Sequence, residues 1–429
     1  MMAVVIGLGA MFGMVAIGIP IAFAMTLSGF VGFGLVVGFG PSMSMVGQLA
    51  FDTVMNYNLS VLPLFILMGN FITRARLSED LYTAAHAFVG HMRGGMALST
   101  LIACGGFSAV SGSSLATAAT MSRVAMPEMR RFGYHDSLAT GSIAAGGTLG
   151  ILIPPSVALV LFGIITGNDI GKLFIAGMVP GLVGLALYCL TVLAVTTVNP
   201  EAGPPGLRSS WRQRFRVLGR VWGVLFLFLV VIGGIYLGVF TTTEAAGIGA
   251  AVAAVFAIVR GGMRPREIYE TLVASARMTA MIFAILIGAM IFANFVNVAG
   301  LLQLLDGLIR SLDLSPMGVL LSVFVLYLIL GMVLESMSMM LLTVPIFYPL
   351  VVGQGFDPIW FGIFVVVVIE ISLITPPVGM NVFVLRSTLP DTPTSTIFKG
   401  VMPFVVADIL RLFLIIAFPW LVLALPGTL

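Results

Sequence analysis

Long apolar runs alternate with short polar segments along the whole chain, and most runs have the length of a membrane-crossing helix. In the first half we expect apolar or amphipathic elements at 3–18, 20–39, 47–73, 76–93, 95–130, 137–167 and 173–198. In the second half we expect them at 217–238, 242–259, 277–299, 300–314, 316–352, 359–388 and 400–424. The pattern therefore predicts an all-α protein that crosses a membrane many times.

The two halves share landmarks in the same order, at a shift of about 222 to 225 residues. The double proline Pro154-Pro155 recurs as Pro376-Pro377, and Asn70 recurs as Asn294. Further matched landmarks are Pro127 with Pro349, Phe174 with Phe398, and Pro180 with Pro403. Self-similarity at one fixed shift indicates a duplicated unit. We therefore divide the chain into repeat 1 (1–198), a linker (199–216) and repeat 2 (217–429).

The segments 95–130 and 316–352 have an unusual length and polarity. Each has about 36 residues, whereas two crossings need about 20 residues each plus a turn. Small polar residues lie at the middle of both segments. A re-entrant hairpin that enters and leaves on the same side fits this pattern, and two thin, tilted crossing helices are the alternative. In either case each repeat crosses an odd number of times, so the second copy is inverted, as in many secondary transporters.

The basic residues give an independent test of this topology, because cytoplasmic segments of membrane proteins are enriched in Lys and Arg. With the arginine-rich linker in the cytoplasm, five crossings per repeat place both termini outside. Of 20 basic residues, seventeen (including Arg76) then lie on the cytoplasmic side. Lys172 and Arg310 lie outside, and Arg411 lies within the last span. The two hairpins would then enter from opposite faces and meet near the middle of the membrane.

Composition narrows the class of protein. Hydrophobic residues make up 59% of the chain and charged residues 9%, whereas a soluble domain has roughly 25% charged residues. No basic run is interleaved with aromatic residues, which argues against nucleic acid as a partner. The sequence has no Walker motif and no grouped nucleophile, base and orienting residue, so we expect neither an ATPase nor another enzyme.

The polar hairpin tips and the double-proline breaks are the candidate binding sites. Unpaired backbone in hydrocarbon is costly, so a broken helix persists where it lines a cavity or binds something. Free carbonyl oxygens with Ser and Thr hydroxyls suit a desolvated alkali cation, and helix N-termini suit an anionic group. One site pairs the tip Ser111–Ser114 with the break Gly150–Ser156; the other pairs Ser336–Ser338 with Ile374–Gly379. The alternative is that these small residues only allow close helix packing.

The cation candidates are Ser111, Gly112, Ser113, Ser114, Gly150, Pro154, Ser336, Ser338, Thr375, Pro376 and Gly379. The substrate candidates are Ser108, Thr148, Pro155, Ser156, Glu335 and Pro377. Among ionisable residues in apolar segments, Glu335 at the second tip is the strongest candidate, and Glu370 is another. Asp408 and Arg411, three residues apart on one helix, are expected to form an internal ion pair. Glu244 follows three threonines and is expected to cap a helix.

Four segments resemble the large membrane subunit of tripartite ATP-independent periplasmic (TRAP) transporters. They are Phe107 to Thr120, Gly147 to Ser156, Leu173 to Gly181, and Leu373 to Gly379. The resemblance implies a fold similar to divalent-anion/sodium symporters, with a scaffold and a transport domain that moves as an elevator. It also implies sodium-coupled symport of small organic acids such as dicarboxylates, keto acids or sialic acids.

The resemblance further implies a bacterial inner-membrane location and two protein partners. These are a small four-helix membrane subunit, expected here as a separate polypeptide, and a periplasmic substrate-binding protein. Two alternatives remain. One is a stand-alone antiporter or symporter of the same superfamily, and the other is a membrane scaffold without transport, which would leave both double-proline breaks unexplained.

Overall fold

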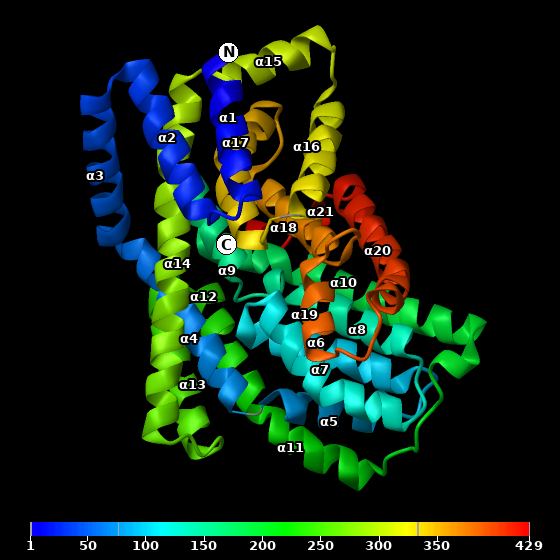
Figure 1. The fold of residues 1–429 in the computed structure, drawn as a ribbon. Helices are drawn as coiled ribbons and strands as arrows, with labels where there is room; N and C mark the ends of the chain where they lie inside the picture. The colour runs from blue at the N-terminus through cyan, green and yellow to red at the C-terminus, as the bar shows by residue number, and fades with distance from the viewer. Residues whose placement is uncertain (1, 76, 333, 429) are drawn as a thin grey trace.

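The computed structural model describes residues 2–75, 77–332 and 334–428, and every regular element in these residues is a helix. Arg76, one of the basic residues assigned to the cytoplasm, lies outside the described residues. The order of the helices along the chain is shown in Figure 1.

The first half contains α1 (Met2–Ala16), α2 (Ile21–Val37), α3 (Phe39–Met55), η1 (Tyr57–Ser60), α4 (Val61–Arg74), α5 (Leu77–Val89), α6 (Gly95–Ser111), α7 (Ser114–Arg131), α8 (Asp136–Thr148), η2 (Leu149–Ile151), α9 (Val157–Thr166), α10 (Ile170–Val198) and η3 (Pro200–Ala202). The second half contains α11 (Trp211–Phe228), the π-helical η4 (Leu229–Gly233), α12 (Gly234–Tyr236), α13 (Thr242–Val259), α14 (Pro265–Val298), α15 (Leu301–Ser311), α16 (Pro316–Gly331), α17 (Ser336–Gly353), α18 (Pro358–Ile374), α19 (Met380–Thr388), α20 (Thr394–Ala417), α21 (Trp420–Leu423) and η5 (Pro426–Thr428).

Four elements differ clearly from the sequence prediction, and one of them is α20 (Thr394–Ala417), which begins and ends earlier than the predicted span 400–424. The span predicted at 47–73 is two helices, α3 and α4, bent by 57°. The bend occurs because Asn56 is extended and its side chain accepts a hydrogen bond from the Asn58 amide, which starts a new turn. α14 begins at Pro265 rather than 277, because Glu267 closes a capping box at its N-terminus. α11 begins at Trp211, capped by Ser210, so the linker is shorter than predicted.

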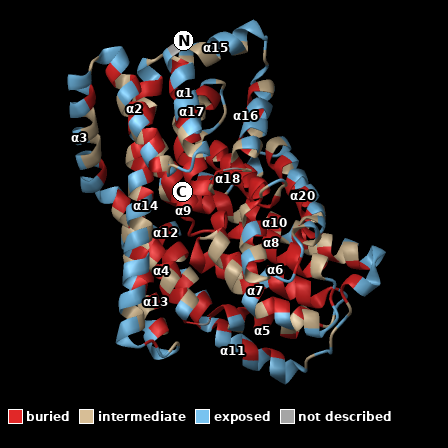
Figure 2. Ribbon diagram, viewed as in Figure 1, coloured by how far each residue is buried: buried red, intermediate tan, exposed pale blue. Residues whose placement is uncertain are grey.

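Within the described residues, six helical segments are individually long and apolar enough to cross a bilayer, and the bent pair α3–α4 makes a seventh. Shorter apolar helices, among them α6, α16 and α18, lie beside them. Burial follows a membrane pattern: large apolar side chains such as Phe51 and Met55 on α3 are exposed on the outer face (Figure 2). The predicted number of ten crossings stays a prediction.

The helix order of the first half recurs in the second half at the same shift as the sequence landmarks. Helices α2, α4 and α6–α10 correspond in order to α13, α14 and α16–α20. The packing is reciprocal. α2 packs on α14 while α13 packs on α4, and α7 packs on α19 while α17 packs on α9. α8 packs on α20 while α10 packs on α18.

Reciprocal packing produces two groups of helices (Figure 1). The first group contains α1–α4, α13 and α14; the second contains α6–α10 and α16–α20. Contacts of α4 with α6 and α9, and of α14 with α17, join the groups. Figure 2 shows that the most deeply buried positions lie inside the second group.

Basic side chains of α11 and of the segment after α13 contact α5, at the end of the molecule where α5 and α11 lie (Figure 1). Arg214 on α11 donates to the Ala87 carbonyl at 3.0 Å. Arg260, just after α13, pairs with Asp80 on α5 at 2.7 Å. Burial raises the pKa of the Asp80 carboxyl, and Arg260 opposes that shift. These contacts hold α11 and the end of α13 against α5.

Candidate functional site

The first hairpin tip is the two-residue turn between α6 and α7. α6 ends at Ser111 because Gly112 adopts a left-handed conformation with φ of 62°. α7 begins at Ser114, and the Ser113 side chain caps it by accepting from the Ala116 amide at 3.4 Å. The Ser111 hydroxyl lies 3.0 Å from that of Thr117. The tip therefore exposes oxygen atoms of short side chains and of the turn backbone.

The first break separates α8 from α9. After Thr148 the chain forms one 3₁₀ turn and then the Pro154-Pro155 step, before α9 starts at Val157. The Ser156 hydroxyl accepts from the Leu159 amide at 3.3 Å and donates to the Ile151 carbonyl. This break is fully buried. The hydroxyl of Ser156, a substrate candidate, thus already donates one hydrogen bond and accepts another.

The structure brings the first tip and the first break together. A Cβ on Gly150 would lie 2.8 Å from the Ser113 carbonyl oxygen, and a Cβ on Gly112 would lie 2.9 Å from the Pro155 carbonyl oxygen. The glycines therefore allow the close packing that the sequence offered as the alternative. The same packing gathers backbone oxygens of the tip and the break at one place, so close packing and oxygen ligation are compatible here.

The second tip, between α16 and α17, is capped by its own carboxylate. Glu335 accepts hydrogen bonds from the Met337 amide at 3.0 Å and the Ser338 amide at 3.2 Å. The Ser336 hydroxyl donates to the same carboxylate at 3.0 Å. The α17 N-terminus, expected to attract an anionic group, thus already holds one.

The second break lies between α18 and α19 and is more open than the first. The Thr375 hydroxyl donates to the Ile371 carbonyl at 2.6 Å. A Cβ on Gly379, which has φ of 58°, would lie 3.3 Å from the carbonyl oxygens of Leu373 and Thr375. Pro376 is half-buried and Pro377 is exposed. Two backbone carbonyls therefore face the glycine turn.

A side chain from repeat 2 ties the first tip to α8. Asn381, at the start of α19, is fully buried. It accepts from the Ser114 hydroxyl at 2.8 Å and donates to the Ala144 carbonyl at 3.0 Å. One amide therefore links α7, α8 and α19 inside the second group of helices.

A cavity of about 80 Å³ lies where the first tip faces the first group of helices. We call it the tip cavity; it is lined by Ile66, Gly69, Asn70, Thr73, Ser111, Gly112, Ser113, Ala116, Val157, Met278 and Met337. The Asn70 side chain donates to the Ser275 hydroxyl at 2.8 Å, which fixes it between α4 and α14. Met337 comes from the second tip, so both tips contribute to the cavity.

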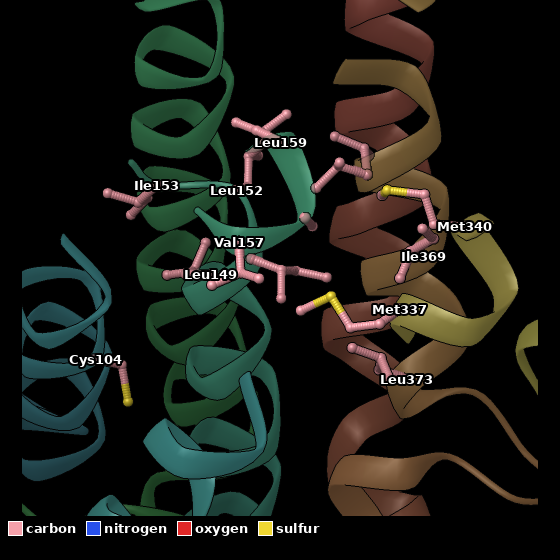
Figure 3. Packing of buried hydrophobic residues seen from close by; sticks show 14 of the residues in the cluster. Cys104, Leu149, Leu152, Ile153, Val157, Leu159, Met337, Met340, Ile369 and Leu373 are labelled. Carbon is pink, nitrogen blue, oxygen red and sulfur yellow. The ribbon is translucent and has the colours of Figure 1, made fainter. Parts of the chain in front are cut away.

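The region beside the tip cavity is apolar. Figure 3 shows residues of the first break and α9, such as Val157 and Leu159, opposite Met337 and Met340 of α17. These side chains are buried, and α9 packs on α17. The polar groups of the tips therefore lie beside buried apolar side chains, where each electrostatic contact is strengthened.

Two substrate candidates lie deeper in the second group. Ser108 is fully buried on α6, and its hydroxyl has no hydrogen-bond partner among the described residues. The Thr148 hydroxyl donates to the Ala145 carbonyl at 2.8 Å and lies 3.1 Å from the Tyr188 hydroxyl. The expected pair of Asp408 and Arg411 is present at 2.8 Å, and Glu244 caps α13 with Thr241 as expected.

Sequence reasoning missed three polar residues of this region. Asn70 serves in the sequence analysis only as a repeat landmark, although a polar amide in an apolar helix itself indicates a functional residue. Asn381 carried the same signal, directly after the second break. Thr73, on the same face of α4 as Asn70, gave no signal of its own.

Comparisons with known proteins agree on one family. The family model described as "Tripartite ATP-independent periplasmic transporter, DctM component" matches residues 8–421. The chain is 38% identical over 379 residues to a C4-dicarboxylate TRAP transporter large permease protein DctM of Pseudomonas aeruginosa, covering 88% of each chain. It is 33% identical to the isethionate TRAP transporter permease protein DctMQ of Oleidesulfovibrio alaskensis, covering 94% of this chain and 62% of that protein.

Among solved structures, the Alcanivorax borkumensis YdaH transporter has a similar fold. The TM-score is 0.63 at 17% sequence identity, and the match covers 90% of each chain. At this identity the likeness concerns the fold alone, and it agrees with an all-helical membrane protein that crosses the bilayer several times.

The Asn381 link gives a stability prediction. Replacing Asn381 with Ala removes both side-chain hydrogen bonds of this residue. Replacing Ser114 with Ala removes the one that the two residues share. Because the two residues share a buried hydrogen bond, a double-mutant cycle should show a coupling of about 1 kcal/mol. Thermal unfolding of the purified chain in lipid nanodiscs measures it.

Ser99→Ala is the matched control. Ser99 is a buried serine of α6, and among the described residues its hydroxyl bonds only to the Gly95 carbonyl of its own helix. The loss of stability caused by Ser99→Ala should add to that caused by Asn381→Ala without coupling. A cycle in which Ser114 and Asn381 are also additive contradicts the link.

Proposed function

Because this chain belongs to the DctM component family of TRAP transporters, we propose that it is the sodium-coupled permease of a binding-protein-dependent importer of small organic acids. The chain is the large permease component of a transporter of small organic solutes, and a multi-pass membrane protein rather than an enzyme. The observation that carries the finer proposal is the contact of the first tip with the first break, where oxygen donors converge.

The proposed sodium sites are the meeting point of the first tip with the first break, and the second break. At the first, the carbonyl oxygens of Ser113 and Pro155 approach glycines on the opposing segment. At the second, the carbonyls of Leu373 and Thr375 face Gly379. Backbone carbonyls and hydroxyls are hard ligands that suit an alkali cation, and broken transmembrane helices coordinate coupling ions in this way in other transporters.

We propose the tip cavity as the solute site. It offers the Asn70 amide and the hydroxyls of Thr73 and Ser111 on one side, and apolar side chains on the other. The α7 N-terminus lies at this cavity through Ser113 and carries partial positive charge. Two of the relatives have names that specify a C4-dicarboxylate and isethionate, both of which are anions. A small organic acid fits these groups.

We propose an elevator movement of the second group of helices against the first. The reciprocal packing of the two halves supports an inverted repeat, with hairpins at α6–α7 and α16–α17. The first group, built around the long α14, would be the scaffold. The second group carries both tips and both breaks, so ions and solute would move with it.

The proposed partners are a small four-helix membrane subunit and a periplasmic substrate-binding protein. The DctMQ relative supports the first, because 38% of that longer permease protein lies outside the match to this chain. The proposed location is the bacterial inner membrane, with the basic end of α5 and α11 in the cytoplasm and both termini outside.

The transport proposal predicts three requirements for uptake. In proteoliposomes, accumulation of a labelled organic acid should need an inward sodium gradient, the small subunit and the binding protein. Removal of any one should reduce uptake to the level of empty vesicles. Uptake by this chain alone, driven by protons, would instead favour a stand-alone antiporter or symporter.

The cation sites predict an effect of Gly112→Ala. Its Cβ would lie 2.9 Å from the Pro155 oxygen and would separate the tip from the break. We expect sodium-dependent uptake to fall at least tenfold at unchanged membrane insertion, measured by initial rates against sodium concentration.

Gly133→Ala is the matched control. Gly133 also has a positive φ of 73°, but nothing lies within 4 Å of the added Cβ. Both variants therefore have the left-handed strain of about 1 kcal/mol, and only Gly112→Ala closes on the proposed site. Equal uptake by both variants would remove the site assignment.

The solute site predicts that Asn70→Ala raises the KM for the solute. Loss of one buried hydrogen bond of about 1 kcal/mol corresponds to roughly a fivefold rise. Ser275→Ala breaks the same Asn70 contact without lining the cavity and should change the KM less. If Ser275→Ala has the larger effect, Asn70 acts through packing rather than through the solute.

A further inference from the structure

Five polar side chains form a continuous chain of contacts deep inside the second group of helices. They are Thr148 on α8, Tyr188 on α10, Glu370 on α18, and Asp408 and Arg411 on α20. Each has 0% of its surface exposed. We call them the buried ion cluster. The proposed transport cycle uses none of its charges.

Arg411 is the centre of the buried ion cluster. Its Nη2 lies 2.5 Å from Glu370 Oε2 and 2.8 Å from Asp408 Oδ1. Tyr188 donates its hydroxyl to Asp408 Oδ2 at 2.6 Å, and Thr148 extends the chain to the end of α8. A Cβ on Gly184 would lie 2.3 Å from Arg411 Nη1, so the glycine makes room for the guanidinium.

The charges of the cluster do not balance. Two carboxyl groups surround one guanidinium, and no other cationic side chain among the described residues pairs with either carboxyl. If both carboxyls were ionised, one net negative charge would be enclosed in a region without solvent inside a membrane protein. An uncompensated buried charge is strongly unfavourable, and such a group takes up a proton instead.

The contacts indicate which carboxyl takes up the proton. Asp408 Oδ2 accepts from the Tyr188 hydroxyl, and Asp408 Oδ1 has no hydrogen bond among the described residues but lies 2.8 Å from Arg411 Nη2 as an ion pair. Glu370 is different: Oε2 accepts from Arg411, and Oε1 has no partner among the described residues. A proton on Oε1 therefore removes no existing contact, whereas a proton on either oxygen of Asp408 would disrupt one.

We propose that the buried ion cluster is a proton-binding site, in which Glu370 holds one proton on Oε1 and Asp408 stays ionised against Arg411. The bound proton makes the cluster electrically neutral. The ionisable groups in contact with the two carboxyls are Arg411 and Tyr188, and Tyr188 donates its own proton to Asp408 without changing the charge. The site takes a proton irrespective of which solute the chain transports.

Infrared spectroscopy tests the proposal on the full chain in lipid nanodiscs at neutral pH. A protonated buried carboxyl gives a carbonyl stretching band that is separate from carboxylate and amide bands. We expect such a band, and we expect it to shift when the chain is produced with glutamate carrying ¹³C in its side-chain carboxyl. Labelled aspartate should leave it in place. No band in the wild-type chain, or a band that shifts with labelled aspartate, overturns the proposal.

Variants test the charge balance. Glu370→Gln should abolish the band, because the proton-bearing group is gone. Asp408→Asn should also abolish it, because Glu370 then becomes the sole counter-charge of Arg411 and ionises. Glu270→Gln, on the exposed face of α14, is the control and should retain the band. A band that survives in Glu370→Gln or in Asp408→Asn overturns the assignment. The isotope experiment stands even if a variant does not fold.

Discussion

The contact between hairpin tips and helix breaks depends on one constraint: backbone polar groups inside hydrocarbon must find partners within the protein. A hairpin that ends in Gly112 and a helix that ends at Thr148 both leave unpaired carbonyls and amides. The chain satisfies part of them locally, through the caps Ser113, Ser156 and Glu335. At the first tip the rest converge with those of the first break, because the tip needs a neighbouring segment that is also polar. The interrupted helices at the tip and at the break thus form one polar centre.

The duplication explains how such centres are held in place. Each half supplies the surface on which the other half packs, so α7 packs on α19 while α17 packs on α9. Asn381 shows the consequence in one residue: an amide from repeat 2 fixes Ser114 of the first tip. Neither half could therefore form its polar centre in the same way alone. This mutual dependence makes the second group of helices one packed unit.

Much of the fold could be predicted from the sequence, because its strongest patterns act directly on where helices form and end. Long apolar runs fixed most helices, and double prolines fixed both breaks at 149–156 and 375–379. Features set by a single polar side chain could not be predicted. The bend at Asn56 depends on one Asx contact, and the cap of α17 depends on the Glu335 side chain. The partner of Arg411 was predicted from helical spacing as Asp408, but Glu370 joins it from another helix, which no local pattern encodes.

The two hairpin tips are not equivalent, because different groups cap the helices that follow them. At the second tip the Glu335 carboxylate already neutralises the positive end of α17. At the first tip only the Ser113 hydroxyl caps α7, and this end lies at the tip cavity beside Asn70. An anionic solute therefore meets favourable potential at the first tip and an existing negative charge at the second. Symmetric backbones with unequal caps thus give the two tips different electrostatic environments.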